Sequence, residues 1–589
     1  MTSKANASLF HLDRRTFVTA GAATIAMRYP LLASIGEPVG VVRPLDFEQI
    51  KAGGDLAIRA DMSFQRLQGD IYRSPQIFKG AEAEWPGDWE GRILLGLTLL
   101  SRATGTTAPS LAKMIQDYPR HMNEFGYFGK ALDTNSINEQ QLSGHGWVLR
   151  GLCELYEWKH DPAVLHMIRA IVDNLALPTR GAYRNYPIEP SHRVTRGGVI
   201  GNLDASQSGW MLSSDIGCAF IFLDGVTHAW TILRTRELKD LIDEMIERFL
   251  PLDLIVVKAQ THASLTSMRA LLRVYEQSQD SRLLFAVEER YALYRTLAMN
   301  EHFANYNWFD RPDSWTEPCA IIDSFIVATQ LWRFTMNPHY LEDAHLIWFN
   351  GIGRGQRPNG GYGTDSCSGV ANPFLKILVY EATWCCTMRG GEGHARSIQY
   401  SYFTRPGEVF IPFFNDSTAH LEVGGEHLAL RQTTEYPYRG HVRLEVLSTT
   451  LKSPIAFRFL AAEWMAHQRI NLNGQAIRPL IKDGFASAHI LPKPGDIVEY
   501  NCSLIVRAHG TRNPHSILNY YSFRAGPLML VHLGGDEIRL PRNSPLSPEA
   551  QGTYRVPGTE LRLSRINDVN SLDLPQKDPC LRQVLFRQA

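Results

Sequence analysis

The segment Gly151-Leu-Cys-Glu-Leu-Tyr156, followed by Asp161-Pro162 and the apolar stretch from Leu165 to Leu175, decides the fold. On both sides of the polar turn, apolar residues recur three and four positions apart, which is the spacing of amphipathic helices. The same helix–turn–helix pattern recurs further along the chain, with first helices that begin near Leu97, Ala229, Leu271 and Ala328. Recurrence over tens of residues indicates a repeat architecture built from helix pairs.

A closed ring of six helix pairs, an (α/α)6 toroid, fits this recurrence better than an open solenoid. Five pairs are clear between Trp89 and Gly351, and the region from Phe78 to Trp85 is the candidate for a sixth. We therefore predict that this toroid spans residues 37–400. An irregular helical bundle is the alternative.

After about Arg396 the pattern changes from helical spacing to alternation. Glu408-Val-Phe-Ile-Pro-Phe-Phe414 and Val442-Arg-Leu-Glu-Val446 alternate in the manner of strands, and turn signals such as Gly424-Gly425 separate the segments. We predict a β-sandwich region over residues 401–545 and an irregular, Pro-rich tail over residues 546–589. The expected fold class is mainly α with C-terminal β: an (α/α)6 toroid followed by one or more β-sandwich domains.

The composition is that of an ordinary globular protein and excludes few functions. The chain of 589 residues carries 60 basic and 60 acidic residues, so its formal net charge is zero. A nucleic-acid binder needs a basic excess to neutralise phosphates, so we expect no nucleic-acid partner. No stretch is long and apolar enough to predict a membrane span. The sequence gives no indication of the oligomeric state.

The N-terminus has the features of a targeting segment. Asp13-Arg14-Arg15-Thr16-Phe17-Val18 looks like a twin-arginine export motif, and the apolar run from Val18 to Met27 follows it. That run is too short and too rich in Ala and Gly to cross a membrane. We predict a twin-arginine-type signal over residues 1–36 and export to the periplasm or beyond. The alternative is an ordinary N-terminal helix.

Two adjacent cysteines, Cys385 and Cys386, indicate a metal site. Neighbouring Cα atoms lie about 3.8 Å apart, whereas an unstrained disulfide wants about 4.4–6.8 Å, so a bond within the pair is disfavoured. With Glu317 and Cys319, the pair offers four ligands of the kind that bind zinc tetrahedrally. Two alternatives stay open: a purely structural zinc site, and Cys367 as the fourth ligand in place of Glu317.

Three pieces of the chain together resemble glycoside hydrolase family 127, the β-L-arabinofuranosidase family. The first is Asn300-Glu301-His302-Phe303 followed by Trp315-Thr-Glu317-Pro-Cys319-Ala320. The second is Trp384-Cys385-Cys386, and the third is the strand-rich stretch from Val409 to Asn471-Leu-Asn-Gly474. The resemblance covers most of the chain, and the spacing of the three pieces is more specific than any one of them.

The resemblance implies roles for individual residues. In that family a glutamate and three cysteines bind zinc, and by motif these are Glu317, Cys319, Cys385 and Cys386. Cys385 also matches the nucleophile, and Glu301 matches the general acid/base because it lies 16 positions before Glu317 (317 − 301 = 16). His145 and His262 match histidines that contact the substrate.

The function implied by the resemblance is that of an exported, zinc-dependent, retaining glycoside hydrolase. Its expected substrate is a terminal furanoside, β-L-arabinofuranose or a related sugar, in an arabinose-containing glycan. Retaining hydrolysis needs a nucleophile on one face of the sugar and an acid on the leaving-group side, and a thiolate can take the place of the usual carboxylate nucleophile.

Two other functions fit parts of the sequence. One is an (α/α)6 polysaccharide lyase or unsaturated-uronyl hydrolase, which would use a Tyr/His base or an Asp-activated water rather than a cysteine pair. The other is a non-catalytic glycan-binding protein with structural zinc. The chain also departs from the family, because Thr387-Met388-Arg389 stands where members often have Pro-Pro-Asn. A further histidine expected near Asp215 has no match.

Overall fold

The computed structural model describes most of the chain after the predicted signal segment, and residues 1–36 and Cys580 lie outside the described residues. The described ranges are 41–80, 84–193, 201–369, 372–514, 519–549, 552–568 and 581–588.

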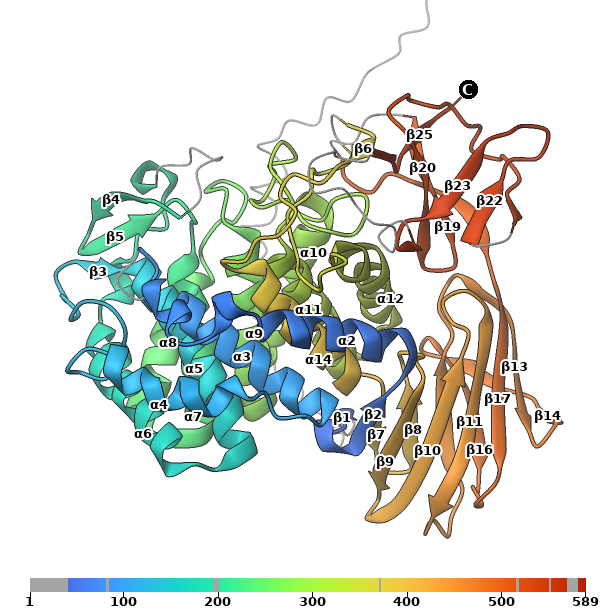
Figure 1. Ribbon diagram of the computed structural model, residues 1–589, viewed down its shortest axis with the longest axis horizontal. Helices are drawn as coiled ribbons and strands as arrows, with labels where there is room; N and C mark the ends of the chain where they lie inside the picture. The colour runs from blue at the N-terminus through green and yellow to red at the C-terminus, as the bar shows by residue number, and fades with distance from the viewer. Residues whose placement is uncertain are drawn as a thin grey trace, which may run out of the picture. The chain divides into compact units, whose positions relative to one another are not determined.

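Six inner helices form a closed ring (Figure 1). Each contacts the next, and the last contacts the first, so the predicted (α/α)6 toroid is confirmed. The inner helices are α3 (Asp88–Thr104), α5 (Glu139–Lys159), α7 (Ile221–Leu233), α9 (Thr261–Ser278), α11 (Pro318–Thr335) and α14 (Cys386–Gln399). The outer helices are α2 (Gly54–Leu67), α4 (Ser110–His121), α6 (Pro162–Ile171), α8 (Arg236–Phe249), α10 (Ser281–Leu297) and α12 (Pro338–Ile347).

The sixth pair is not where the sequence analysis placed it. In its described residues, the stretch from Phe78 to Trp85 contributes the end of a short 3-10 turn, η4 (Gln76–Gly80), whereas α14 closes the ring and α2 packs against both α14 and α3. Helix α14 was not predicted from the sequence because it contains Gly390, Gly391 and Gly393, and glycine is a poor helix former. Close packing explains them: a Cβ on Gly390 would lie 2.3 Å from the Tyr362 ring.

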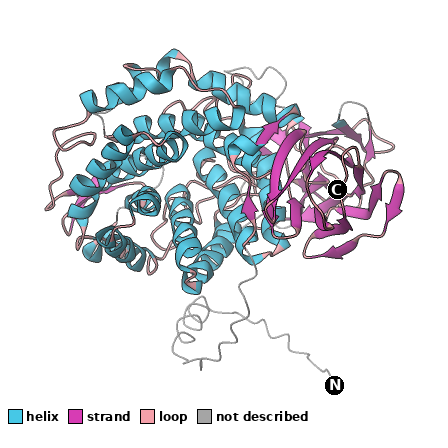
Figure 2. Ribbon diagram, turned by 90° about the horizontal axis from the view of Figure 1, so that it is seen from below, coloured by secondary structure: helices cyan, strands magenta, loops and turns pink. Residues whose placement is uncertain are grey.

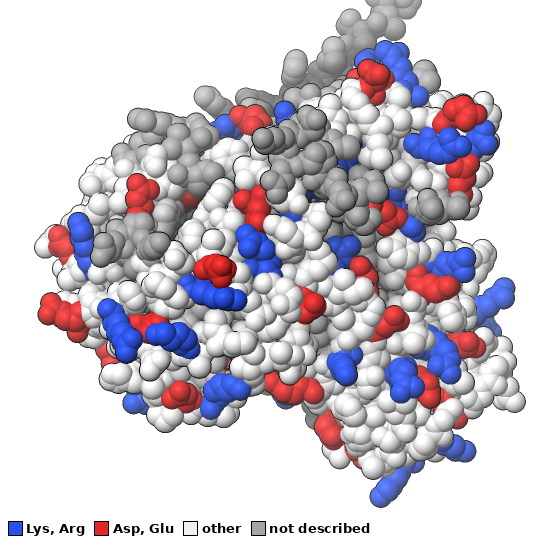
Figure 3. Space-filling view, viewed as in Figure 1, with Lys and Arg blue, Asp and Glu red and all other residues white. Residues whose placement is uncertain are grey.

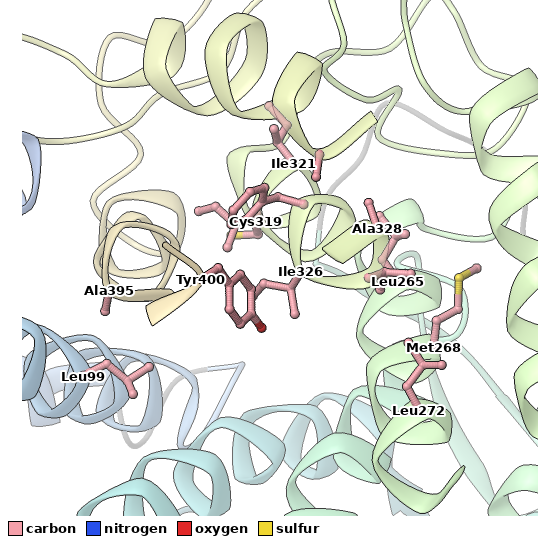
Figure 4. Packing of buried hydrophobic residues seen from close by; sticks show 14 of the residues in the cluster. Leu99, Leu265, Met268, Leu272, Cys319, Ile321, Ile326, Ala328, Ala395 and Tyr400 are labelled. Atoms are coloured by element: carbon pink, nitrogen blue, oxygen red, sulfur yellow. The ribbon is translucent and has the colours of Figure 1, made fainter. Parts of the chain in front are cut away.

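Local signals start the helices, and apolar burial holds them together. Helix α6 begins with Pro162 after the N-cap Asp161, whose side chain accepts a hydrogen bond from Ala163 N. Between the inner helices, apolar side chains such as Leu265 on α9 and Ala328 on α11 lie close together (Figure 4). Burying one leucine side chain contributes about 1.5–3 kcal/mol, so the ring is a rigid platform for groups at its mouths.

All six inner helices run in the same direction. A cavity of about 1120 Å³ at one mouth of the ring is lined by residues from the second half of every inner helix. These include Arg102, Glu154, His228, Arg273, Gln330 and Arg396. The first turns of the same helices therefore gather at the opposite mouth.

The strands gather beside the helices (Figure 2). Most strands of the two sheets described next follow α14, which ends at Gln399, whereas the short β1 and β2 precede the first toroid helix. Phe459 of one sheet stacks on Tyr500 of the other with ring centroids 5.1 Å apart, so the sheets face each other as a sandwich. The first sheet has the order β1 (Arg43–Pro44), β7 (Phe403–Arg405), β8 (Glu408–Ile411), β12 (Ile455–Leu460), β16 (Phe485–Ile490), β15 (Leu480–Lys482). The second has the order β14 (Gln475–Ile477), β13 (Met465–Leu472), β17 (Ile497–Leu504), β11 (Gly440–Thr449), β10 (Glu426–Thr434), β9 (Ser417–Val423), β2 (Ile50–Ala52).

The C-terminal residues form a third sheet, which differs from the irregular tail expected over residues 546–589. Its main order is β18 (Val506–Gly510), β19 (Tyr520–Ala525), β20 (Leu528–Leu533), β23 (Arg562–Arg565), β22 (Thr553–Arg555), β21 (Ser547–Pro548). The short strands β24 (Arg582–Gln583), β25 (Phe586–Arg587) and β6 (Phe374–Leu375) pair at its side. Most strands contributed by the tail are two or three residues long, which is too short for a visible alternation.

The surface agrees with the balanced composition. On the face shown in Figure 3, Lys and Arg are interspersed with Asp and Glu, without an extended basic field. Within the described ranges, no helix combines the length and the apolar character needed to cross a membrane.

Candidate metal and catalytic site

Three thiols meet at the mouth where the inner helices begin. Cys319 is the second residue of α11, Cys386 is the first residue of α14, and Cys385 is its N-cap. Helix N-termini present free N–H groups and the positive end of the helix dipole, which stabilise thiolates. The three cysteines therefore lie at helix N-termini, where a negatively charged thiolate is stabilised.

The spacing of the thiols fits a metal site. The three Sγ atoms all lie within 4.8 Å of one another, with 3.3 Å between Cys385 and Cys386 and 3.9 Å between Cys319 and Cys386. Two sulfurs bound tetrahedrally at about 2.3 Å from one zinc ion lie about 3.8 Å apart. The seven cysteines in the described ranges are free thiols, so no disulfide among them competes for these sulfurs.

Glu317 brings a carboxylate to the same place. It is the N-cap of α11, and its main-chain N–H donates to Asn305 Oδ1 at 2.8 Å. Its Oε1 lies 3.2 Å from His262 Nδ1, while Oε2 is buried without a hydrogen-bond partner among the described residues. A buried carboxylate oxygen without a donor is costly, and a metal ion would satisfy it. Within 4.8 Å, Glu317 groups with His262 and Cys319, and Cys319 is also a member of the three-thiol cluster, so the two possible ligand groups share Cys319.

The thiols differ in charge and access. The pKa of Cys385 is lowered to about 5 by hydrogen bonds from the Cys319 and Cys386 thiols and by the positive charge of Arg92. Burial instead raises the pKa of Cys319, although Arg92 Nη1 lies 3.5 Å from its sulfur. Cys385 is partly exposed, whereas Cys319 and Cys386 are buried. Cys385 is thus the member of the cluster best able to act as a nucleophile.

His262 lies inside the site between two carboxylates. Its Nε2 is 3.4 Å from Asp323 Oδ2, and its ring stacks on Trp147 with centroids 5.4 Å apart. His262, Glu317 and Cys319 also place ligand atoms within 4.8 Å of one another, which makes His262 a further candidate ligand. Its observed contacts orient Glu317, and its contact with substrate stays a prediction.

The sequence analysis missed Asp323. Its buried carboxylate accepts hydrogen bonds from the Thr266 hydroxyl at 2.6 Å and from the guanidinium groups of Arg269 and Arg389. Asp323 therefore lies behind His262, with Oδ2 3.4 Å from Nε2, although among the described residues Nε2 has no hydrogen-bond partner. It lies four residues after Cys319, on the same face of α11, and that spacing is the signal that could have found it.

The partners of His145 are main-chain groups. Its Nδ1–H donates to Gln141 O at 2.7 Å, and its Nε2 accepts from Phe128 N–H at 2.9 Å. Burial lowers the pKa of His145 to about 4, so the ring is neutral. These bonds join the loop at Phe128 to helix α5. A contact with substrate would require one of them to break, and that role stays a prediction.

Glu301 lies on the loop between α10 and α11, and Cys367 lies on the chain between Gly355 and β6. Glu301 Oε1 accepts hydrogen bonds from the main-chain N–H groups of Arg512 and Asn513, each at 2.9 Å. Nothing in the sequence indicated that residues so far along the chain would reach Glu301. The Cys367 thiol lies 3.5 Å from Asn305 O, and burial raises its pKa. Among the described residues, Cys367 is not part of the ligand cluster.

The fold and the site together define a class: a toroid of six helix pairs followed by β-sheets, with a thiol cluster at one mouth. Residues 408–504 match the family model described as β-L-arabinofuranosidase, GH127 middle domain. The chain is thus GH127-like, as the sequence resemblance predicted. A search of curated protein sequences gives no significant match.

Solved structures share the fold over nearly the whole chain. A GH127 β-arabinofuranosidase is 12% identical, with a TM-score of 0.69 over 93% of this chain and 98% of its own. The GH127 β-L-arabinofuranosidase Ara127N from Geobacillus stearothermophilus T6 is 13% identical, with a TM-score of 0.69 over 92% of this chain and 100% of its own. At these identities the likeness establishes a common fold, and the chemistry has to be argued from the residues.

Proposed function

We propose that the protein is an exported, zinc-dependent, retaining glycoside hydrolase that releases a terminal furanoside, β-L-arabinofuranose or a related sugar. The observation that carries this proposal is the partly exposed Cys385 thiol, with its pKa lowered to about 5, in a three-thiol cluster at the mouth of a toroid. The GH127 middle domain over residues 408–504 supports the choice of sugar.

In the proposed first step, Cys385 Sγ attacks the anomeric carbon as the bond to the leaving oxygen breaks. Glu301 donates its proton to that oxygen. In the second step, Glu301 removes a proton from water, the water oxygen bonds to the anomeric carbon, and the carbon–sulfur bond breaks. Two inversions at one carbon retain its configuration.

Glu317, Cys319, Cys385 and Cys386 are the residues that would hold zinc. Zinc bound there would supply the positive charge that keeps coordinating thiols deprotonated at neutral pH. Two observations support this assignment: Glu317 Oε2 has no hydrogen-bond partner in the part of the chain that the structure describes, and the Sγ atoms of Cys385 and Cys319 lie 3.3 Å and 3.9 Å from that of Cys386.

The proposal is tested by a panel of aryl furanosides, with metal content measured on the same sample. We expect release of the arabinofuranoside with retained configuration, and about one zinc ion per chain. Prolonged chelation should remove activity and lower the melting temperature, because an ion bound to the folded state at 1,000 times its Kd stabilises that state by about 4 kcal/mol. Zinc should restore both. Full activity in metal-free protein would sink the zinc assignment.

The two other functions are tested by adding a uronate-containing polysaccharide to the panel, because a lyase removes the acidic proton next to a uronate carboxyl group. A product with a new ultraviolet-absorbing double bond would indicate a lyase. Zinc and glycan binding without product on every furanoside would indicate a binding protein. The cysteine cluster favours the hydrolase over both, because neither of them needs a partly exposed thiol of low pKa.

Export is the remaining part of the proposal, and the Arg14-Arg15 pair supports it. Replacing both arginines by lysine should leave the full-length protein in the cytoplasm, because the twin-arginine route depends on that pair. Cell fractionation and immunoblotting of the two forms measure this. Equal amounts of both forms in the periplasm or medium would contradict export by this route.

A further inference from the structure

The chain just after strand β18 reaches the loop that carries Glu301. Strand β18 ends at Gly510, and the main-chain N–H groups of Arg512 and Asn513 both donate to Glu301 Oε1, each at 2.9 Å. Glu301 is 3% exposed, so these two bonds form in a nearly dry environment. Hydrogen bonds to an ionisable group in such an environment are stronger and more directional than in water.

The Arg512 side chain fixes this segment to the same loop. Its guanidinium donates to Asn300 O, lies 4.0 Å above the Phe303 ring, and places Nη1 2.9 Å from Met299 Sδ. Its Nε is also 3.7 Å from Glu301 Oε2. A single side chain therefore contacts the loop on both sides of Glu301.

Asn513 adds a second anchor. It is buried, and its Nδ2 donates to the Tyr306 hydroxyl at 3.2 Å. The two residues thus contact both the carboxylate and the loop around it. An ordinary contact between a sheet and a helical ring would not need two main-chain N–H groups directed at one carboxylate oxygen.

We propose that Arg512 and Asn513 are positioning residues for Glu301, supplied to the catalytic mouth by the C-terminal sheet. The two N–H groups hold Oε1, and the Arg512 guanidinium lies beside Oε2, so together they fix the position of the side chain. The inference rests on the proposed function only in so far as Glu301 is the acid/base. The C-terminal sheet is then part of the catalytic machinery, because displacing a catalytic group by about 1 Å can cost about 100-fold in rate.

The test compares two leaving groups in the full-length, zinc-loaded protein. A poor leaving group, such as an alkyl alcohol, needs a proton from Glu301, whereas 2,4-dinitrophenolate leaves without one. In Arg512→Ala, kcat/KM should fall about 10–100-fold for the alkyl furanoside and less than about 3-fold for the dinitrophenyl furanoside. Arg512→Lys keeps the charge and should fall in between.

Arg507→Ala is the matched control. Arg507 lies on β18, in the same sheet, and its side chain pairs with Glu463 at 3.0 Å and contacts His509 rather than Glu301. It should leave both rates unchanged. An equal loss for both leaving groups in Arg512→Ala would assign Arg512 a merely structural role and overturn the proposal.

A double-mutant cycle tests whether Arg512 acts through Glu301. The pair Arg512→Ala with Glu301→Gln should be no slower on the alkyl furanoside than Glu301→Gln alone, and additive losses would overturn the proposal. If Arg512→Ala does not fold, kcat/KM on the alkyl and dinitrophenyl furanosides is compared in Asn513→Ala and Arg512→Lys instead.

Failure of the proposed function gives a different result from failure of the positioning role. If the native chain hydrolyses no furanoside, the hydrolase assignment falls and the contact is tested by stability. Arg512→Ala and Glu301→Ala should then have coupled effects on the denaturation midpoint, because each removes a partner of the other. Independent effects would show that the 512–513 segment does not hold Glu301.

Discussion

Replacing Cys385 by serine is expected to abolish turnover, with a loss in kcat/KM of at least about 10⁴-fold, as for other enzymes that lose a covalent nucleophile. The change exchanges one sulfur for oxygen, so packing at the start of α14 is kept. What is lost is the thiolate, because a serine hydroxyl stays protonated where the Cys385 thiol has a pKa of about 5. Steady-state rates on an aryl arabinofuranoside measure the loss.

Cys367→Ser is the matched control for this experiment. Cys367 is a buried thiol, unlike the partly exposed Cys385, and among the described residues it lies outside the ligand cluster. It should retain most of the activity. Rapid quenching of the native enzyme during turnover, followed by peptide mass spectrometry, should find one sugar attached to Cys385. Activity of Cys385→Ser within about 10-fold of the native rate would contradict the nucleophile assignment.

Those parts of the fold that are specified by apolar spacing and turn residues within one segment could be predicted from the sequence. Polar turns such as Asp161-Pro162 end one helix and cap the next, so most of the toroid could be inferred from apolar spacing alone. Helix α14 could not, because its glycines are favourable only against partners such as Tyr362 that the sequence does not identify. The strands β1 and β2 are three residues or shorter, and they exist only because they pair with β7 and β9.

The residues of the candidate site also fall into two groups: those that local motifs identify and those that only the folded chain brings together. Glu317 with Cys319, and the pair Cys385-Cys386, lie in two short motifs, so their joint role could be proposed before their proximity was known. Asp323 and Arg512 were not found, because their roles depend on contacts made across the fold. Arg512 lies 211 positions after Glu301, and no spacing rule connects them.

Glu301→Gln should distinguish a catalytic role of Glu301 from a structural one, because it should lower kcat/KM with little change in the melting temperature. The glutamine Oε1 can still accept both N–H groups of the 512–513 segment, so the loop should keep its position and the melting temperature should change little. The amide cannot supply an acidic proton from its other end. We therefore expect a loss in kcat/KM of about 10²–10⁴-fold for an alkyl furanoside, which is the usual contribution of general acid–base catalysis.

The dinitrophenyl furanoside and Glu301→Ala complete this test of Glu301. Attack by Cys385 on the dinitrophenyl substrate needs no proton donor, so in Glu301→Gln this step should stay fast while hydrolysis of the sugar–cysteine intermediate becomes slow. A burst of dinitrophenolate followed by a slow steady rate is the expected signature. Glu301→Ala also removes the acceptor of two buried N–H groups, which should lower the melting temperature as well. If Glu301→Gln hydrolysed both substrates at native rates while Glu301→Ala unfolded early, Glu301 would be an anchor for the C-terminal sheet, and the acid/base would have to be sought among the other carboxyl groups at this mouth.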